Sequence, residues 1–320
     1  MDDIKNDSIK RQVNVRRLWD IFKDELIYSN RFFPYEKIEN RFLDRIDNIM
    51  SIYKSTVRKG SLWYRAREYF IKSPAIYSNK ELSLMSDDER KKFNEINDEL
   101  FFEENLMNTA KTIKSYEEFS DDYSSDLDYF NNLIKSFECF LEKEKTSVWG
   151  YDKKGSGIAP REQAGLNRAS PKYISYLYLA KNSNTALAEV KAVPNQLFSV
   201  AKYKINKQIN VINFSNLSTM PKLSDEEMTI YNCIYMAFSS PTQYDEKDYI
   251  ISQYISEYIK RNGYDGVMFN SSRNIGGVNL TLFYDDICDF LGSSIHEVTE
   301  IKVKTRQLLP LSLKKKGDNP

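Results

Sequence analysis

A small set of polar side chains, standing next to apolar and aromatic segments, has the chemistry to bind an anion and to stabilise a positive charge. A guanidinium group matches the oxygens of a phosphate. A carboxylate beside arginines and hydroxyls can stabilise an oxocarbenium-like centre while the arginines hold a diphosphate. From these residues alone we predict an anionic ligand in the cleft of an α/β or α+β protein. The candidates are Arg65, Arg168, Tyr178, Glu189, Ser271 and Ser272.

The stretch 155–191 is expected to bring three of these side chains together. Its first part is rich in Gly and Pro, which predicts a loop with sharp turns. Residues 176–180, YLYLA, carry no charge and predict a buried strand. Asn182 is a candidate N-cap for a helix over 185–191. A loop arginine, a strand tyrosine and a helix glutamate would then face one cleft, and loops held on a rigid scaffold often carry function.

A second strand is predicted at Leu62–Arg67, LWYRAR. Arg65 and Arg67 are two residues apart, so both side chains point to one face of that strand. Two interpretations stay open here. The pair binds an anionic ligand, or it forms structural salt bridges.

Composition excludes several classes of protein. Lys plus Arg and Asp plus Glu both number 46, and a net charge of zero argues against a dedicated nucleic-acid binder. The three cysteines are far apart, which argues against a disulfide framework or a Cys-type zinc site and fits a reducing cytoplasm. The single histidine, His296, is expected at the surface or in a turn, so neither a Ser-His-Asp triad nor a multi-His metal site is indicated. No signal peptide and no membrane span are expected.

Two regions outside this centre are predicted to be helical. In residues 12–58, apolar residues at helical spacing predict two helices separated by Pro34. We expect these helices to pack on the main domain, or to contact a partner or a second copy of the chain. Residues 72–147 lack glycine and are acidic over most of their length, which predicts a helical insertion with a solvated face. A lid or a partner-binding arm is the alternative for this insertion.

The C-terminal half is predicted to alternate strands with two helices. Residues 197–204 and 208–214 are expected to pair as strands across a short turn. Ser224 has capping-box spacing and opens a helix that ends near Pro241. The other predicted elements are a helix over 245–261 and strands over 266–269, 278–284 and 298–305.

At these residues the sequence resembles the RES-domain family, the toxin halves of many bacterial toxin–antitoxin pairs. Four blocks occur in the family's order, which makes the resemblance specific. They are Leu62–Arg67, Trp149–Ala180, Thr185–Val190 and Gly263–Phe283. The family's G-R-x-N segment reads Asn167-Arg168-Ala169-Ser170 here, so two of its positions differ.

The resemblance implies an α+β fold similar to the ADP-ribosyltransferase toxins, with mixed central β-sheets flanked by helices. Residues 1–58 would be an N-terminal helical segment, and residues 59–320 an NAD-processing RES domain that contains the insertion. The implied activity is cleavage of the nicotinamide–ribose bond of NAD+, with transfer to phosphate, giving ADP-ribose-1''-phosphate, or to water. An antitoxin protein is the implied partner, and no metal is implied.

The resemblance also implies roles for single residues. Arg65 and Arg168 would hold the diphosphate or the incoming phosphate, and Tyr178 would stack on nicotinamide or adenine. Glu189 would accept a hydrogen bond from the nicotinamide ribose and stabilise positive charge as the nicotinamide–ribose bond breaks. Ser271, with Ser272 beside it, would orient a phosphate or ribose hydroxyl. A protein ADP-ribosyltransferase and a non-catalytic NAD-binding module are the alternative functions.

Overall fold

The computed structural model describes residues 2–70, 91, 150–215, 223–241 and 247–301, with side chains from residue 10 onward. The acidic insertion predicted at 72–147 lies almost wholly outside these ranges, and so do residues 302–305 of the last predicted strand.

Eight strands of the described residues form one sheet in the order β1-β5-β6-β7-β3-β2-β4-β8. β5 and β6 run parallel, whereas the other neighbouring pairs are antiparallel, so the sheet is mixed. Together with the helices around it, this sheet confirms the predicted α+β class. The strands are β1 (Lys54–Val57), β2 (Leu62–Glu68), β3 (Leu177–Ala180), β4 (Leu197–Ile205), β5 (Ile209–Asn213), β6 (Gly266–Asn270), β7 (Val278–Leu282) and β8 (Cys288–Glu297).

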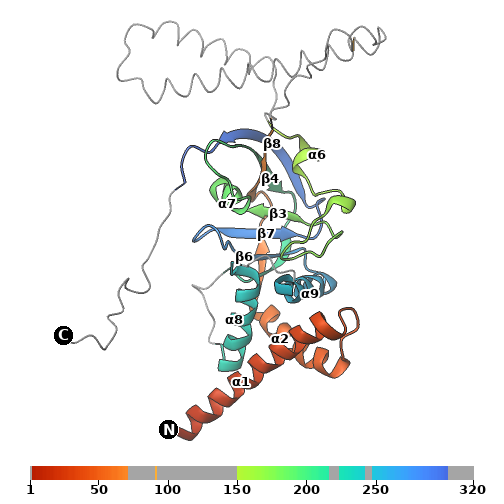
Figure 1. The fold of residues 1–320 in the computed structure, drawn as a ribbon, viewed down its shortest axis with the longest axis vertical. Coiled ribbons are helices and arrows are strands. Elements are labelled where there is room, and N and C mark those ends of the chain that lie inside the picture. Colours follow the sequence, from red (N-terminus) through yellow and green to blue (C-terminus); the bar gives the residue numbers. More distant parts are fainter. Residues whose placement is uncertain (1, 71–90, 92–149, 216–222, 242–246, 302–320) are drawn as a thin grey trace, which may run out of the picture.

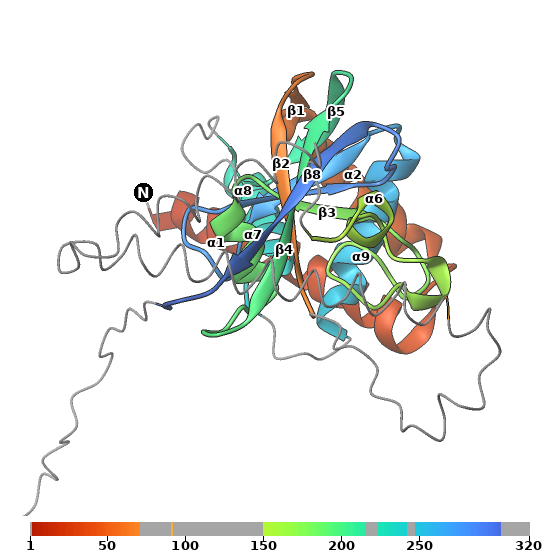
Figure 2. The same cartoon turned by 90° about the horizontal axis from the view of Figure 1, so that it is seen from above.

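The longer helices gather at one end of the molecule, below β6 in Figure 1. Their apolar faces share a core with β5 and β6, in which Phe22, Phe42 and Ile234 are fully buried. Seen from above, the strands cross the middle of the molecule (Figure 2). The helical elements are α1 (Asp2–Asp24), η1 (Glu25–Ser29), α2 (Glu36–Tyr53), α6 (Lys153–Ser156), η2 (Arg161–Gln163), α7 (Ser183–Glu189), α8 (Asp225–Ser239) and α9 (Lys247–Arg261).

A second core lies inside the curve of the sheet. Val57 on β1 and Cys288 on β8 belong to the same buried cluster, although these strands are the two ends of the sheet. The sheet therefore curls until its ends share apolar side chains. Strands β3 and β2 are joined at a single residue pair, Tyr64 and Ala180.

The N-terminal helices pack on the main body, as one of the two interpretations predicted. The Tyr254 hydroxyl on α9 donates a short hydrogen bond to Glu39 on α2, and the Tyr258 hydroxyl donates to Asp47 Oδ1 at 2.8 Å. Residues 54–57 were predicted to be helical, and this prediction was wrong, because they form β1 beside β5. The domain boundary between residues 58 and 59 stays a prediction.

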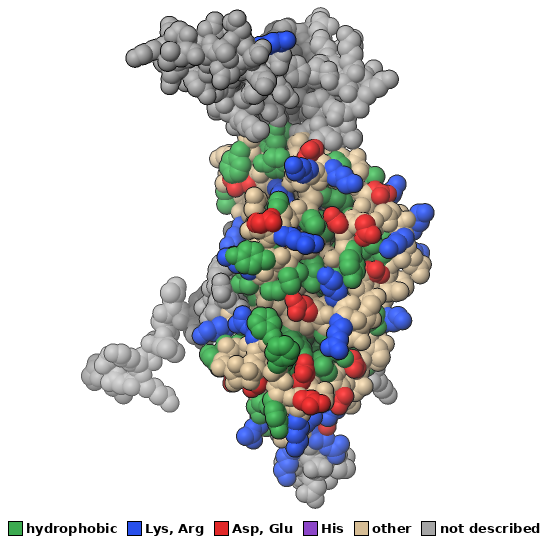
Figure 3. Space-filling model, turned by 90° about the vertical axis from the view of Figure 1, so that its right-hand side faces the viewer, with side chains coloured by type: hydrophobic (Ala, Val, Ile, Leu, Met, Phe, Trp, Pro, Cys, Tyr) green, Lys and Arg blue, Asp and Glu red, His purple; other side chains and the backbone are tan. Residues whose placement is uncertain are grey.

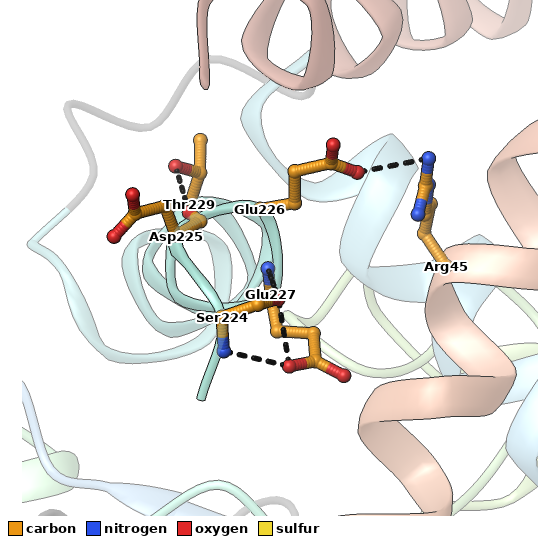
Figure 4. A network of polar contacts seen from close by, with 6 residues as sticks. All are labelled: Arg45, Ser224, Asp225, Glu226, Glu227 and Thr229. Carbon is orange, nitrogen blue, oxygen red and sulfur yellow. Dashed lines mark hydrogen bonds and ion pairs between the residues drawn. The ribbon is translucent and has the colours of Figure 1, made fainter. Parts of the chain in front are cut away.

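The predicted capping box at the start of α8 is present (Figure 4). The Ser224 hydroxyl accepts from the Glu227 backbone N–H at 3.3 Å, and the Ser224 backbone N–H donates to Glu227 Oε2 at 2.8 Å. The Ser224 backbone N–H and then the Ser224 hydroxyl, both donating to Glu227 Oε2, lower the pKa of Glu227, because these bonds favour the ionised carboxylate. The preceding residue, Glu226, forms a salt bridge with Arg45 of α2 at 3.0 Å and so links α8 to α2.

Two strand predictions were wrong. β4 and β5 do not pair with each other, because β4 lies between β2 and β8 while β5 lies between β1 and β6. Sequence adjacency favoured a hairpin, but both edges of β4 are taken by other strands. The last described strand is β8, before the predicted 298–305. Its polar sequence and the irregularity at Gly292 hid the apolar alternation on which the prediction depended.

The surface mixes charges of both signs. On the face shown in Figure 3, basic and acidic side chains alternate with apolar ones. This agrees with the net charge of zero. No helix in the described part of the chain is long and apolar enough to cross a membrane.

Candidate active site

The candidate residues meet at a cleft of about 910 Å³, which is within the size range of small-molecule and cofactor sites. Arg65, Arg168, Tyr178, Glu189 and Ser272 all line it, and Ser271 contacts Glu189 directly. These residues come from β2, the loop after η2, β3, α7 and the loop after β6. The structure thus brings together side chains that lie more than 200 positions apart in the chain. Their individual roles stay predictions.

Glu189 is the last residue of α7, and its carboxylate is firmly held. The helix begins where the Asn182 side chain accepts the Thr185 N–H at 2.8 Å, as predicted. At the other end, Glu189 Oε1 accepts from Ser271 Oγ at 2.6 Å and from Asn279 Nδ2 at 2.7 Å. Glu189 Oε2 receives no hydrogen bond from any residue that the structure describes. One carboxylate oxygen is therefore fixed by the protein and the other is open to a ligand.

The loop between β6 and β7 braces α7. Ser271 Oγ accepts the backbone N–H groups of Arg273, at 3.1 Å, and Asn274, at 3.0 Å. Asn274 Nδ2 then donates to Thr185 Oγ1 at 2.8 Å. Gly277 lies so close to Thr185 that a Cβ at this position would be 2.7 Å from Thr185 Oγ1. The loop, the helix and Glu189 therefore form one connected unit.

Arg65 places a buried cation at the cleft. Within the described residues its Nη1 has no hydrogen-bond partner, although the atom is buried. Burial, and then the nearby charge of Arg67, lower the pKa of Arg65 to about 10. Both effects disfavour the charged form, so an anion beside this group would be strongly stabilised. Arg67 has a different contact, since its Nη2 donates to the Gly157 carbonyl at 2.7 Å and anchors the Gly-rich loop.

Arg168 lines the cleft, but two of its donors are already used. Its Nη1 donates to the Ala237 carbonyl at 2.6 Å and its Nη2 to the Ser240 carbonyl at 2.7 Å. These carbonyls end α8, where a positive charge complements the helix dipole. The guanidinium also lies 5.5 Å from the centre of the Tyr249 ring. Burial lowers the pKa of Arg168, while Tyr249 and Glu189 oppose that shift.

Tyr178 holds the loop that carries Arg168. Its hydroxyl lies 2.9 Å from Ser170 Oγ and accepts the Ala169 N–H at 3.3 Å. Burial raises the pKa of Tyr178, so the phenol stays neutral at physiological pH. Ser170, one of the two departures from the family pattern, is fully buried and completes this contact. Asn167, the other departure, donates its N–H to the Ser170 carbonyl at 2.9 Å and closes the turn.

Helix α9 fixes the same loop from the other side. Ser252 Oγ donates to the Arg168 carbonyl at 2.7 Å, and Gln253 Nε2 donates to the Asn167 carbonyl at 2.8 Å. Since α9 also forms side-chain hydrogen bonds with α2, the N-terminal helices support the wall of the cleft indirectly.

The charge lining the cleft is predominantly positive. Among the described residues that line it, Glu189 is the carboxylate, and the cations are Arg65, Arg168, Lys191 and Arg273. Such a lining favours an anionic ligand with several charged oxygens. Among the described residues, no group of three or more His, Cys, Asp or Glu side chains could hold a metal ion.

Sequence reasoning missed Asn279. It lies in β7, which reads VNLTL, and its side chain is only 7% exposed. A polar residue inside a strand that is otherwise buried needs a hydrogen-bond partner, and this rule was the available signal. The partner itself, Glu189, is 90 residues away in the chain, so only the fold could reveal it.

Comparisons with known proteins agree with the last three of the four blocks, whereas the first block, Leu62–Arg67, lies outside the matched range. The model of the RES domain family matches residues 145–304, which is half of the chain. A search of curated proteins finds no match. Among solved structures, the chain is similar to one from the crystal structure of the M. tuberculosis MbcT–MbcA toxin–antitoxin complex. The TM-score is 0.29 and the identity 10%, over 44% of this chain and 76% of that chain. A likeness this weak bears on neither substrate nor mechanism, whereas the family match is extensive, and the chain belongs to the RES domain family.

Proposed function

We propose that this protein degrades NAD+ by breaking the nicotinamide–ribose bond and transferring the ADP-ribose unit to phosphate or water. Membership of the RES domain family supports this reaction class. The observation that carries the proposal is Glu189. Its carboxylate is held at one oxygen by two donors, and its other oxygen receives no bond from the described residues of a cationic cleft.

In the proposed reaction, the bond between C1'' of the nicotinamide ribose and the nicotinamide nitrogen breaks, and its electron pair goes to the nitrogen. Nicotinamide then leaves as a neutral molecule, and positive charge develops on the ribose ring. The carboxylate of Glu189 stabilises that charge, which is greater in the transition state than in the bound substrate. An oxygen of phosphate or water forms the new bond to C1'', and the proton of the attacking acceptor is released to solvent.

The diphosphate of NAD+ is proposed to lie beside Arg65. This guanidinium is buried and has an Nη1 without a partner in the described part of the chain, so phosphate oxygens would supply the missing acceptor. Arg168 would add positive charge to the cleft while its fork keeps the end of α8 in place.

The test incubates the purified protein with NAD+, with and without phosphate, and separates the products by chromatography. We expect nicotinamide release, together with ADP-ribose-1''-phosphate when phosphate is present. Glu189→Gln is expected to abolish the release, because the variant keeps the size of the side chain but not its charge. Glu68→Gln, an exposed change on β2, is the matched control and should retain full activity.

Three other results would redirect the proposal. Label transferred from NAD+ to a protein band would indicate a protein ADP-ribosyltransferase. NAD+ binding without turnover would indicate a binding module. If the protein neither binds NAD+ nor releases nicotinamide with any acceptor, the proposed function is refuted.

An antitoxin partner is part of the same proposal, because RES domains are the toxin halves of many toxin–antitoxin pairs. We expect expression of the chain to arrest cell growth and to lower cellular NAD+. Co-expression of an antitoxin encoded beside it should restore both. Growth arrest that persists in Glu189→Gln would contradict NAD+ loss as the cause.

A further inference from the structure

Asn279 lies within the fourth sequence block, Gly263–Phe283, but the resemblance to the family gives it no role. Its strand, β7, lies between β3 and β6, where Asn279 is opposite Ala180 on one side and Phe269 on the other. Pairing on both edges fixes its backbone, and the side chain is 7% exposed. A short side chain on such a strand has little freedom to move. It is therefore a rigid donor toward Glu189 Oε1, at 2.7 Å.

Ser271 completes the arrangement from the neighbouring loop. A hydroxyl has one hydrogen to donate and two lone pairs to accept with. The Ser271 hydrogen goes to Glu189, and the two lone pairs accept the N–H groups of Arg273 and Asn274. Every hydrogen-bonding position of this hydroxyl is used within the protein, so a ligand cannot bond it without breaking one of these contacts.

We propose that Asn279 and Ser271 are positioning residues for Glu189, and we call the pair the Glu189 clamp. It rests on the proposed function and deepens it. A glutamate has several rotatable bonds, and ordering it costs conformational entropy. The two hydrogen bonds to Oε1 order the side chain when the protein folds, before NAD+ binds. They leave Oε2 as the oxygen that faces the ribose. Ser271 thus acts through Glu189, instead of orienting a phosphate or ribose hydroxyl itself.

The clamp predicts a particular division of kinetic effects. A residue that acts only by aiming Glu189 changes the rate of bond cleavage and leaves NAD+ affinity nearly unchanged. Asn279→Ala and Ser271→Ala are each expected to lower kcat about 10- to 100-fold, the range for losing one hydrogen bond to a charged group. KM and the Kd for NAD+ should stay within about twofold.

The double variant tests whether the two residues act as one unit. Since both hold the same oxygen, their combined effect on kcat should be smaller than the product of the two single effects. Asn206→Ala is the matched control. Its amide also donates to a carboxylate, Asp289, but outside the cleft, and kcat should not change. A raised KM with normal kcat in Asn279→Ala would show direct contact with the ligand and overturn the clamp, and so would independent effects in the double variant.

A crystal structure of Asn279→Ala separates the clamp from the reaction. We expect the Glu189 carboxylate to adopt a different rotamer or to spread over more than one. An unchanged carboxylate overturns the clamp whatever the activity. If the wild-type protein releases no nicotinamide but the variant displaces Glu189, the proposed reaction is wrong and the clamp stands.

Discussion

Replacing Gly277 by alanine tests how tightly the cleft depends on the contact between the β6–β7 loop and α7. The added Cβ would lie 2.7 Å from Thr185 Oγ1 and 2.8 Å from Thr185 Cγ2. An ordinary carbon–carbon contact begins at 3.4 Å, so one of the two segments must move by several tenths of an ångström. Thr185 lies one helical turn before Glu189, and a shift of α7 therefore moves the carboxylate as well.

The size of the effect follows from this geometry. Overpacking of a tight contact costs about 1–3 kcal/mol, which lowers the Tm by roughly 2–6 °C in a chain of this size. A misplacement of about 1 Å can lower the rate of a catalysed reaction about 100-fold, so we expect kcat to fall at least about tenfold. Thermal melting and chromatographic measurement of nicotinamide release check the two effects.

Thr185→Ala provides the control for this reasoning. Alone it loses the hydrogen bonds of Thr185 Oγ1 with Asn182 and Asn274, at a cost of about 1–2 kcal/mol. In the double variant with Gly277→Ala, both Thr185 atoms that clash are gone and only the contact of the new Cβ with the Asn274 carbonyl oxygen, at 3.0 Å, is left, so most of the loss in Tm caused by Gly277→Ala should disappear. If the two losses in Tm simply add, the clash is not the cause and the reasoning is refuted.

Three further predictions concern other parts of the molecule. Arg65→Met should weaken NAD+ binding about 10- to 100-fold, because a charge-assisted contact to the diphosphate is lost. It should not lower the Tm of the ligand-free protein, since a buried cation whose Nη1 has no partner among the described residues is removed. Calorimetry and thermal melting check this against Arg58→Met, an exposed change between β1 and β2, and a large loss of Tm would contradict it. Ser224→Ala should lower the unfolding free energy by about 1 kcal/mol in denaturant titrations. The pKa of Glu227 is lower in the folded than in the unfolded protein. The difference in unfolding free energy between wild type and variant should therefore be present above the ordinary carboxyl pKa, and it should shrink as the pH falls through the pKa of Glu227 in the folded protein. Burial, and then nearby aspartates, raise the pKa of Cys288 to about 12. The unfolding free energy should therefore fall as the pH rises from about 9 towards 12, and the part of this fall that is due to the thiol should be absent in Cys288→Ala. A thiol reagent at pH 8 should label this cysteine only when the protein unfolds.

Local sequence signals predicted most elements correctly, because those elements form from neighbouring residues. Asn182 accepts the N–H three residues on, and Ser224 forms its capping box with Glu227 in the same turn. The predicted helix pair before β1 and the strand at Leu62–Arg67 likewise depend on periodicity within one segment. The predictions that failed needed information from elsewhere. The pairing of β4 is decided by β2 and β8, and neither neighbour can be inferred from β4 itself.

The candidate site divides in the same way. Residue types at strand and helix ends, with their resemblance to a family, were enough to select Arg65, Arg168, Tyr178, Glu189, Ser271 and Ser272. They were not enough to predict what each side chain contacts. Arg67 and Arg65 are equivalent by sequence, yet one bonds the Gly157 carbonyl and the other keeps a buried donor at the cleft.

The sequence by itself determined the blocks, the chemistry that their side chains offer, and the family. Only the tertiary structure decided that Glu189 meets Ser271 and Asn279 across 82 and 90 positions of chain. It also decided that the Arg168 fork closes the end of α8. The physical reason is that side-chain hydrogen bonds depend on distances of about 3 Å between atoms. Those distances are set by the curl of the sheet and the packing of α7, α8 and α9, to which residues throughout the chain contribute.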